Sequence, residues 1–206
     1  MTNQINDEYI FPIPYWWIDI TDIDNDKMLE ACYEIERNDP GRTRSNIGGY
    51  QTVDLSHDHP AFRDLLNHIQ SIAETVYEKA YLPFWNSPYK ISIGNYWCNI
   101  NRKHAFNMNH VHPGSFLSGV YYVKADSELD QGSITFRRDH NWVMQHRNYF
   151  TDPKKKGECP AFLEECVSLP ARTGALLLFP SSLPHHVEPN QTDADRVAIS
   201  FNIDLK

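Results

Sequence analysis

The sequence contains no apolar run close to the roughly 18 consecutive residues that a membrane-spanning helix requires. Its N-terminus is polar and acidic (MTNQINDEYIF) and lacks the apolar core of a secretory signal. Basic residues are also scarce, because 19 Lys and Arg stand against 27 Asp and Glu, which gives a formal net charge of −8. Proteins that bind nucleic-acid phosphates or anionic membrane surfaces are normally basic, so we expect neither partner.

Cysteine is also scarce, with four residues and no CxxC pattern. The four are Cys32, Cys98, Cys159 and Cys166. In a chain of this length such a pattern is typical of reduced thiols and not of a disulfide framework. We therefore expect a cytoplasmic protein. The sequence leaves its oligomeric state open, a dimer included.

The rest of the composition is that of a globular domain. Of the 206 residues, 41% are hydrophobic, 13% aromatic and 22% charged, which excludes a disordered, coiled-coil or collagen-like chain. A chain of this size buries about 70% of its surface on folding. That is enough for one sizeable core, so we expect a single domain or one core with an N-terminal extension.

The first 90 residues predict a strand and two helices that pack on the core. Residues 9–20 are aromatic but carry two prolines, which cannot donate to a ladder and so favour an edge strand or extended arm. A short helix is expected over about residues 27–37, where an Asn-Asp-Pro-Gly turn follows. After Pro60, apolar residues recur at intervals of three and four and predict an amphipathic helix of about 20 residues.

Residues 91–206 have a different texture, in which short β-branched and aromatic runs alternate with turn residues. The candidate strands are 91–99, 116–124, 132–137, 166–170, 174–180 and 195–204. Several short strands at this spacing are typical of a sandwich or jelly roll, so the sequence predicts a mainly β fold with N-terminal helices. The polar insert at 137–165 is too long for an ordinary connection and is a candidate substrate lid.

Ten histidines are present, and two groups of them could contribute to a metal site. His110 and His112 are separated by one residue, so on a strand both imidazoles would point to the same face. Neutral imidazole is the commonest metal ligand, although an H-x-H pair also occurs by chance on polar loops. His185 and His186 follow an apolar strand and a Pro-bounded turn. They are either a solvent-exposed pair or the source of a distal ligand.

An arginine begins the last predicted strand. Arg196 shares one face with Ser200 and Asn202, while the residues between them are apolar and suited to the core. A guanidinium inside a barrel is costly unless it meets an anion, and its planar fork suits a carboxylate. The alternative is an edge strand whose polar face is simply wet.

These pieces resemble a known family when taken together. The segments HVHPGSFLSGVYYV, FPSSLPHHVEPN and RVAISFN are similar to motifs of the 2-oxoglutarate/Fe(II)-dependent oxygenases, in the prolyl-hydroxylase-like branch. The pattern looks closest to a small group known from phages and bacteria, for which a phage-encoded member would act in the host cytoplasm. The resemblance covers about residues 97–203 and implies a double-stranded β-helix, also called a jelly roll or cupin-like fold. Residues 1–90 match only loosely, through FPIPYW and SNIGGYQT.

The resemblance also implies a metal site. His110 matches the first ligand and His185 the distal ligand, because the family pattern has a Val two residues later, as here at Val187. The family usually has Asp or Glu at the second ligand position, where this chain has His112. Our first interpretation is a three-His site. The second is a two-His site with water in the third position, in which His112 does not bind the metal directly but lies next to its ligands.

For the co-substrate, the resemblance implies that Arg196 pairs with the distal carboxylate of 2-oxoglutarate and that Ser200 assists it. Tyr122 and Ser118 match positions that line the co-substrate pocket, and Asn99 is a weaker candidate on the preceding strand.

The function implied is an Fe(II)- and 2-oxoglutarate-dependent dioxygenase that hydroxylates a peptide or a small molecule. The competing hypotheses are a non-enzymatic jelly-roll module for binding or structure, and a three-His zinc enzyme with an open water position. A carboxylate clamp formed by Arg196 and Ser200 favours the oxygenase, because a zinc hydratase does not need one.

Overall fold

The structure consists of strands in two sheets and helices that follow the N-terminal strand. The computed structural model describes residues 12–85, 88–138 and 166–206. The larger sheet contains β1 (Trp16–Asp19), β3 (Tyr50–Gln51), β4 (Ile91–Asn101), β6 (Leu117–Lys124), β9 (Ala175–Pro180) and β11 (Arg196–Leu205). The smaller sheet contains β2 (Asn46–Ile47), β5 (Phe106–His110), β7 (Ile134–Arg137), β8 (Cys166–Leu169) and β10 (His185–Val187). The helices are α1 (Asn25–Asn38), α2 (Arg63–Ala80) and the 3-10 turn η1 (Leu82–Phe84).

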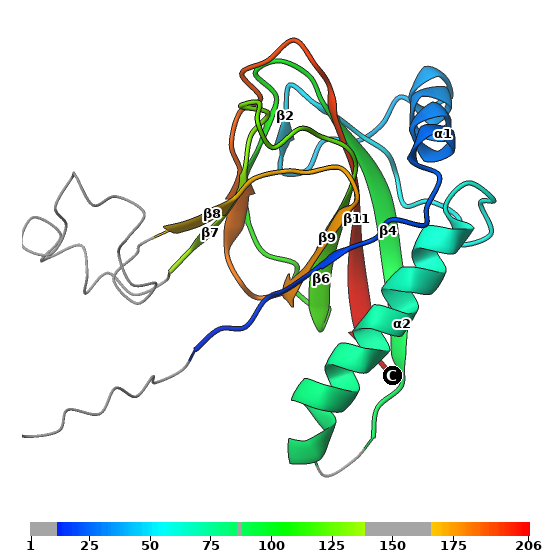
Figure 1. Ribbon diagram of the computed structural model, residues 1–206, viewed down its shortest axis with the longest axis vertical. Helices are drawn as coiled ribbons and strands as arrows, with labels where there is room; N and C mark the ends of the chain where they lie inside the picture. Colours follow the sequence, from blue (N-terminus) through cyan, green and yellow to red (C-terminus); the bar gives the residue numbers. More distant parts are fainter. Residues whose placement is uncertain (1–11, 86–87, 139–165) are drawn as a thin grey trace, which may run out of the picture.

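Every strand pair is antiparallel, and the two sheets lie opposite each other (Figure 1). The strand order is β1-β9-β6-β11-β4-β3 in the larger sheet and β2-β5-β10-β7-β8 in the smaller one. Neighbours in each sheet are mostly distant in sequence, as is expected of a jelly roll. Residues 12–85 do more than pack on this core, because β1, β2 and β3 extend its sheets.

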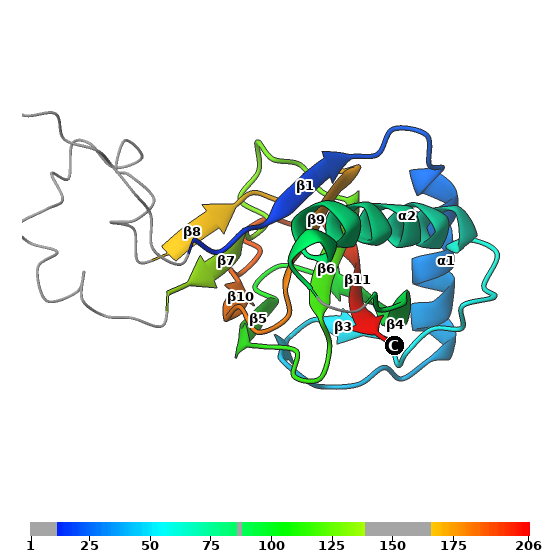
Figure 2. The same cartoon turned by 90° about the horizontal axis from the view of Figure 1, so that it is seen from below.

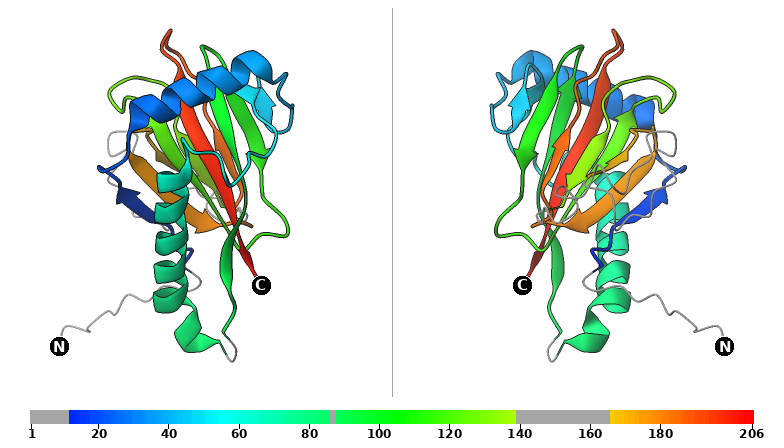
Figure 3. Two further views of the ribbon diagram at one scale, coloured as in Figure 1. Left: turned by 90° about the vertical axis from the view of Figure 1, so that its right-hand side faces the viewer. Right: turned by 90° about the vertical axis from the view of Figure 1, so that its left-hand side faces the viewer.

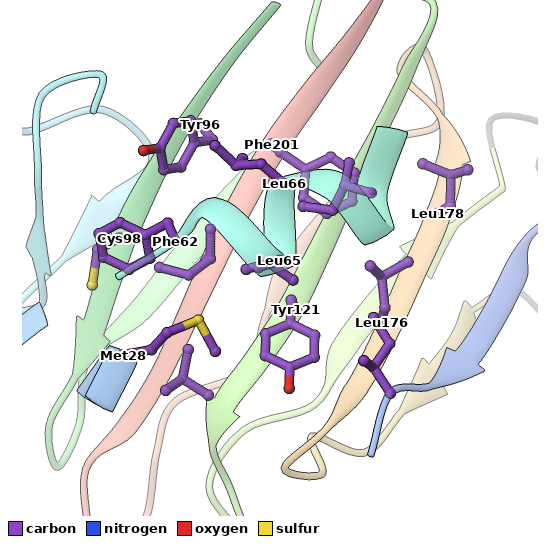
Figure 4. Close-up of a cluster of buried hydrophobic side chains, with 14 of the residues drawn as sticks. Met28, Phe62, Leu65, Leu66, Tyr96, Cys98, Tyr121, Leu176, Leu178 and Phe201 are labelled. Carbon is purple, nitrogen blue, oxygen red and sulfur yellow. The ribbon is translucent and has the colours of Figure 1, made fainter. Parts of the chain in front are cut away.

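Both helices cover the outer face of the larger sheet (Figures 2 and 3). Figure 4 shows Phe62 and Leu65, from the start of α2, packed with Met28 of α1 over Tyr121 and Leu176 of the sheet. Each of these side chains is at most 1% exposed. Full burial of one large apolar side chain stabilises a fold by about 1.5–3 kcal/mol. This outer layer is therefore the main apolar core.

Strand β11 lies between β6 and β4 and separates two environments. Val197, Ile199 and Phe201 are fully buried in the outer core with the helices. The alternate residues of β11 point to the other side, into the space between the sheets. One strand thus fixes the helix layer and the interior of the barrel at the same time.

The structure confirms the predicted helices and the six predicted strands to within a few residues. It also confirms the edge position predicted for the aromatic N-terminal segment, where β1 pairs with β9 at the end of the sheet. Strands β2, β3, β5 and β10 were not predicted. None of the helices in the described ranges has the length and hydropathy needed to cross a bilayer.

The predicted insert begins and ends at neighbouring points of the smaller sheet. Arg137, the last residue of β7, is paired with Cys166, the first residue of β8. Residues 139–165, which include nearly all of the predicted substrate lid, lie outside the described residues.

Candidate active site

A cavity of about 780 Å³ lies between the two sheets. It is lined from the larger sheet by inward residues of β4, β6 and β11, and from the smaller sheet by β5, β10 and the residues after β5. The size is within the range of about 300–1,000 Å³ that is usual for small-molecule sites. Three of the histidines and the arginine singled out in the sequence line this cavity.

The histidines come together because β5 and β10 are neighbours. His185, the first residue of β10, is paired with His110, the last residue of β5, and His112 follows two residues later. One ring nitrogen from each of His110, His112 and His185 lies within 4.8 Å of the others. The ring centroids are 4.4–5.2 Å apart. The three imidazoles can therefore reach a common point.

Backbone carbonyls fix the ring orientation of two of these histidines. The Nδ1–H of His110 donates to the carbonyl of Met108 at 2.7 Å, and the Nδ1–H of His185 donates to the carbonyl of Leu183 at 2.8 Å. In both rings this leaves the lone pair on Nε2, the state in which imidazole binds a metal.

Burial keeps the cluster neutral. It lowers the pKa of His112 to about 4 and that of His185 to about 3, with the neighbouring His110 adding to both effects. Burial also lowers the pKa of His110. The ring of His185 lies edge-on to Phe179 at 4.8 Å, which removes water from that ring. At neutral pH the cluster thus offers lone pairs and no positive charge, which suits a divalent cation.

His186 lies outside the cluster, although it is next to His185 in sequence. Its Nε2 lies 2.8 Å from Oε1 of Glu188, and it does not line the cavity. As predicted, the HH pair follows an apolar strand, β9, and a turn, and both residues lie on the three-residue strand β10. Alternation along this strand separates the two rings.

Arg196 lies inside the barrel with only 4% of its surface exposed. Its Nη1–H donates to the carbonyl of Gly132 at 2.5 Å, and among the described residues no carboxylate pairs with it. Burial lowers the pKa of the guanidinium. The neighbouring Tyr122 is 3% exposed, and burial raises the pKa of its hydroxyl to about 12. Within the part of the chain that the structure describes, the cavity therefore contains a buried cation that is hydrogen-bonded to a neutral carbonyl and to no carboxylate.

Polar groups of β4 and β11 lie further along the same wall. The Nδ2–H of Asn99 donates to Oγ of Ser200 at 3.0 Å, and both residues line the cavity. The Oδ1 atom of Asn99 is buried without a hydrogen-bond partner. Ser118, which was predicted to line the pocket, is not one of the residues that line this cavity. Its hydroxyl is buried and donates to Oδ1 of Asn202 at 2.7 Å.

One wall of the cavity was missed by the sequence analysis. Arg42, Arg44 and Asp54, from the segment between the helices, line the cavity next to Trp97 of β4. These residues belong to no motif, and the loosely matching segment SNIGGYQT beside them was the only available indication. Pairing of β2 with β5 and of β3 with β4 brings this segment to the cavity.

A comparison with protein families finds one match, to the family described as "Putative 2OG-Fe(II) oxygenase", over residues 95–202. The match spans just over half of the chain and includes the histidine cluster and Arg196. The chain belongs to this family. A search of curated proteins gave no match.

Solved structures support the fold of the oxygenase. A prolyl-4-hydroxylase from Pseudomonas putida matches with a TM-score of 0.64 and 11% identity, covering 94% of each chain. A prolyl hydroxylase from Trichoplax adhaerens, in complex with a hypoxia inducible factor peptide fragment, matches with a TM-score of 0.62 and 13% identity, covering 92% of this chain and 83% of that one. HygX from Streptomyces hygroscopicus, with nickel and 2-oxoglutarate bound, matches with a TM-score of 0.60 and 14% identity, over 93% and 83% of the chains. These similarities confirm the double-stranded β-helix.

The carbonyl that holds Arg196 belongs to a glycine in a left-handed conformation, with φ of +85° at Gly132. A Cβ atom there would lie 2.0 Å from the carbonyl oxygen of Glu188. We predict that Gly132→Ala lowers the free energy of unfolding by about 2–5 kcal/mol, combining about 1–2 for the backbone conformation with about 1–3 for overpacking.

Gly114→Ala is the matched control, because Gly114 has φ of +94° but open space around its Cβ position. It should lose only the conformational part, about 1–2 kcal/mol. Urea unfolding of both variants measures the difference, and equal losses would contradict the predicted contact at Glu188.

Proposed function

We propose that this oxygenase is a hydroxylase that holds Fe(II) through His110, His112 and His185 and binds the distal carboxylate of 2-oxoglutarate through Arg196. The observation that carries the proposal is the joint placement of a neutral histidine cluster and an unpaired buried arginine in one cavity. A metal site alone would also suit a zinc enzyme. A buried cation beside it adds a place for an anionic co-substrate.

The histidine cluster fits a transition metal on its own chemistry. Two rings have their tautomer set by backbone carbonyls, and all three are kept neutral by burial. Nitrogen ligands of this kind suit Fe(II), Ni(II) and Zn(II) alike, so the choice of iron rests on the family. His112 stands where the family usually has a carboxylate, and a three-imidazole site leaves a bound divalent ion one unit more positive.

The polar wall fits 2-oxoglutarate. A buried guanidinium without a carboxylate is costly, and a bound carboxylate would remove that cost through charge-assisted hydrogen bonds. A 180° rotation of the Asn99 amide would let Oδ1 accept from the Ser200 hydroxyl and leave Nδ2 as the unpaired donor. That orientation suits a dianion, which offers only acceptors.

Bound together, Fe(II) and 2-oxoglutarate supply oxidation of a C–H bond by O₂, with release of succinate and CO₂. The residues of this chain orient these groups and exclude water. Phe179 and Phe136 pack against His185 on the dry side of the cluster, with ring centroids at 4.8 and 6.0 Å. For the substrate, a peptide or a small molecule is consistent with the peptide bound by the Trichoplax adhaerens enzyme and the hygromycin B bound by HygX.

An anaerobic titration with Fe(II) and 2-oxoglutarate tests the proposed function. We expect a weak visible charge-transfer band in the wild-type protein and in His186→Ala, because His186 lies outside the cluster. His110→Ala should abolish the band. If folded wild-type protein binds Fe(II) and 2-oxoglutarate but gives no band, the proposed function is wrong.

Arg196→Gln should raise the half-saturating concentration of 2-oxoglutarate by about 10- to 100-fold, since a hydrogen bond to a charged group contributes about 1.5–3 kcal/mol. The variant removes a buried unpaired charge and is expected to remain folded. Succinate release measures the effect. Arg172→Gln, at an exposed cation paired with Asp19, is the control and should change nothing. An unchanged half-saturation in Arg196→Gln would show that Arg196 is not the clamp.

His112→Ala should weaken Fe(II) binding by at least about 100-fold, which exceeds the usual 10- to 100-fold loss for a residue that only supports a ligand. His112→Asp supplies the usual family ligand and should restore most of the affinity. Competition with a chelating dye under anaerobic conditions gives both values. Equal affinity of wild type and His112→Ala would favour the two-His site.

A further inference from the structure

The residues that line the cavity have a net positive charge, whereas the chain as a whole is acidic. The chain as a whole has a net charge of −8. The described residues that line the cavity nevertheless include three arginines and one acidic residue, with no lysine or glutamate. They are Arg42, Arg44, Arg196 and Asp54. Positive charge is therefore concentrated at the cavity that contains the histidine cluster.

Two of these arginines are accounted for, one by the proposed co-substrate and one by an ion pair. Arg196 is the proposed clamp for the co-substrate. Arg42 donates from Nη2 to Oδ1 of Asp54 at 2.5 Å, and the Nδ2–H of Asn95 donates to the same oxygen at 3.2 Å. The guanidinium of Arg42 also lies over the ring of Trp97, 6.0 Å from its centroid. Asp54 and Arg42 thus compensate each other within a fixed wall.

This wall is connected directly to the histidine cluster. The ring centroid of Trp97 lies 5.7 Å from that of His112. Trp97 therefore separates the Arg42–Asp54 pair from the candidate metal ligands by a single ring. A molecule held at this wall would therefore lie close to the histidine cluster.

Arg44 is the remaining cation. Its backbone N–H donates to Oδ1 of Asn46 at 2.7 Å, and Nδ2 of Asn46 in turn donates to the carbonyls of Arg42 and Gly49 at 3.2 and 3.1 Å. Arg44 is exposed and is one of the residues that line the cavity, and its guanidinium has no ion pair or hydrogen bond with any described residue. An anchored backbone thus places at the cavity an arginine that is unpaired among the described residues.

We propose that the substrate carries a carboxylate and that Arg44 binds it, a substrate class that rests on the proposed function. With Asp54 compensated, the Arg42–Arg44–Asp54 wall has a net charge of one positive unit, which matches a monoanion. A phosphate ester, with nearly two negative charges at neutral pH, would leave one charge uncompensated. The planar guanidinium fork also matches a carboxylate in a bidentate arrangement.

The neutral side chains of the wall support a polar substrate. The cavity is also lined by Asn95, Asn107, Asn109 and Gln51. Amides donate and accept hydrogen bonds without adding charge. They suit the uncharged polar groups of a molecule whose single charge is held by Arg44.

Binding of matched probe pairs tests the proposal without turnover. The small-molecule pairs are N-acetylglycine with N-acetylglycinamide and N-acetylproline with N-acetylprolinamide. The peptide pair is acetyl-Gly-Asp-Gly-amide with acetyl-Gly-Asn-Gly-amide. Ligand-observed NMR is run on the wild-type protein and on Arg196→Gln, in which the other unpaired cation of the described lining is removed. In both proteins we expect the carboxylate member of a pair to bind about three- to fivefold more tightly, the scale of an exposed ion pair.

Arg44→Gln should abolish the preference, and Arg44→Lys should retain most of it. Arg37→Gln is the matched control, because it makes the same change at an exposed arginine of α1 that does not line the cavity. The proposal is overturned if no pair shows a carboxylate preference, or if the preference survives in Arg44→Gln. A preference confined to the peptide pair would identify the source as an acidic side chain, and one confined to the small pairs a free acid.

The outcome is separable from that of the proposed function. The probes are measured without metal or 2-oxoglutarate, whereas the anaerobic titration measures those two alone. Loss of the charge-transfer band with an intact carboxylate preference would overturn the proposed function and leave Arg44 as an anion site. A normal band without any carboxylate preference would overturn only the inference about the substrate.

Discussion

The pairing of β5 with β10 is the contact on which the candidate site depends. Its register sets His110 opposite His185, although the two residues lie far apart in the sequence. The chain then leaves β5 through a turn in which the backbone N–H of His112 donates to the carbonyl of Ser181 at 2.9 Å. The third ring is thereby held beside the other two. A shift of one residue would turn these side chains to the opposite face of the sheet, so the cluster exists only in this register.

The larger sheet provides the rest of the cavity, because its strands place apolar side chains on the outer face and polar side chains on the inner face. On its outer face the helices bury a continuous apolar layer, which provides most of the stability. Its inner face is then free to carry Asn, Ser and Arg side chains, which would weaken a core of this size if they had to form it. Arg196 shows this division most clearly, since it is almost fully buried and yet begins a strand whose next residue, Val197, belongs to the apolar layer.

Helices and strands with a clear apolar periodicity could be predicted from the sequence. Short strands that are held extended only by pairing with their neighbours could not. The helix α2 and the strand β11 each carry a long repeat of apolar residues, so both were found nearly to their ends. Strands β5 and β10 are short and consist largely of His and Asn, which have no preference for strands, and only their neighbours in the sheet hold them extended. The three histidines were still predicted, because their motifs can be recognised in the sequence without knowing where the strands are.

Side chains whose role depends on a partner were harder to predict. Ser118 shares a face with Tyr122, as its spacing indicates, but its hydroxyl is bound by Asn202 of the next strand, and no periodicity reports that contact. Arg42 and Asp54 reach the cavity only because two-residue strands attach their loop to both sheets.

The net charge of the proposed metal site depends on His112, which stands where the family usually has a carboxylate. With three neutral imidazoles, a divalent ion, the Arg196 guanidinium and the 2-oxoglutarate dianion would together carry one positive unit, under the assignment proposed above. A carboxylate ligand at this position would lower that charge to zero and would place a negative charge close to Trp97 and the Arg42–Asp54 pair. It would thus weaken the attraction of that wall for an anionic substrate. Under the two proposals, the histidine at the position where the family pattern has a carboxylate would thus favour an anionic substrate at the cationic wall. Under the two proposals, the three-His cluster and Arg44 would be two parts of one electrostatic arrangement, in which Arg42 compensates Asp54 and the remaining negative charge is the one that the bound molecules bring.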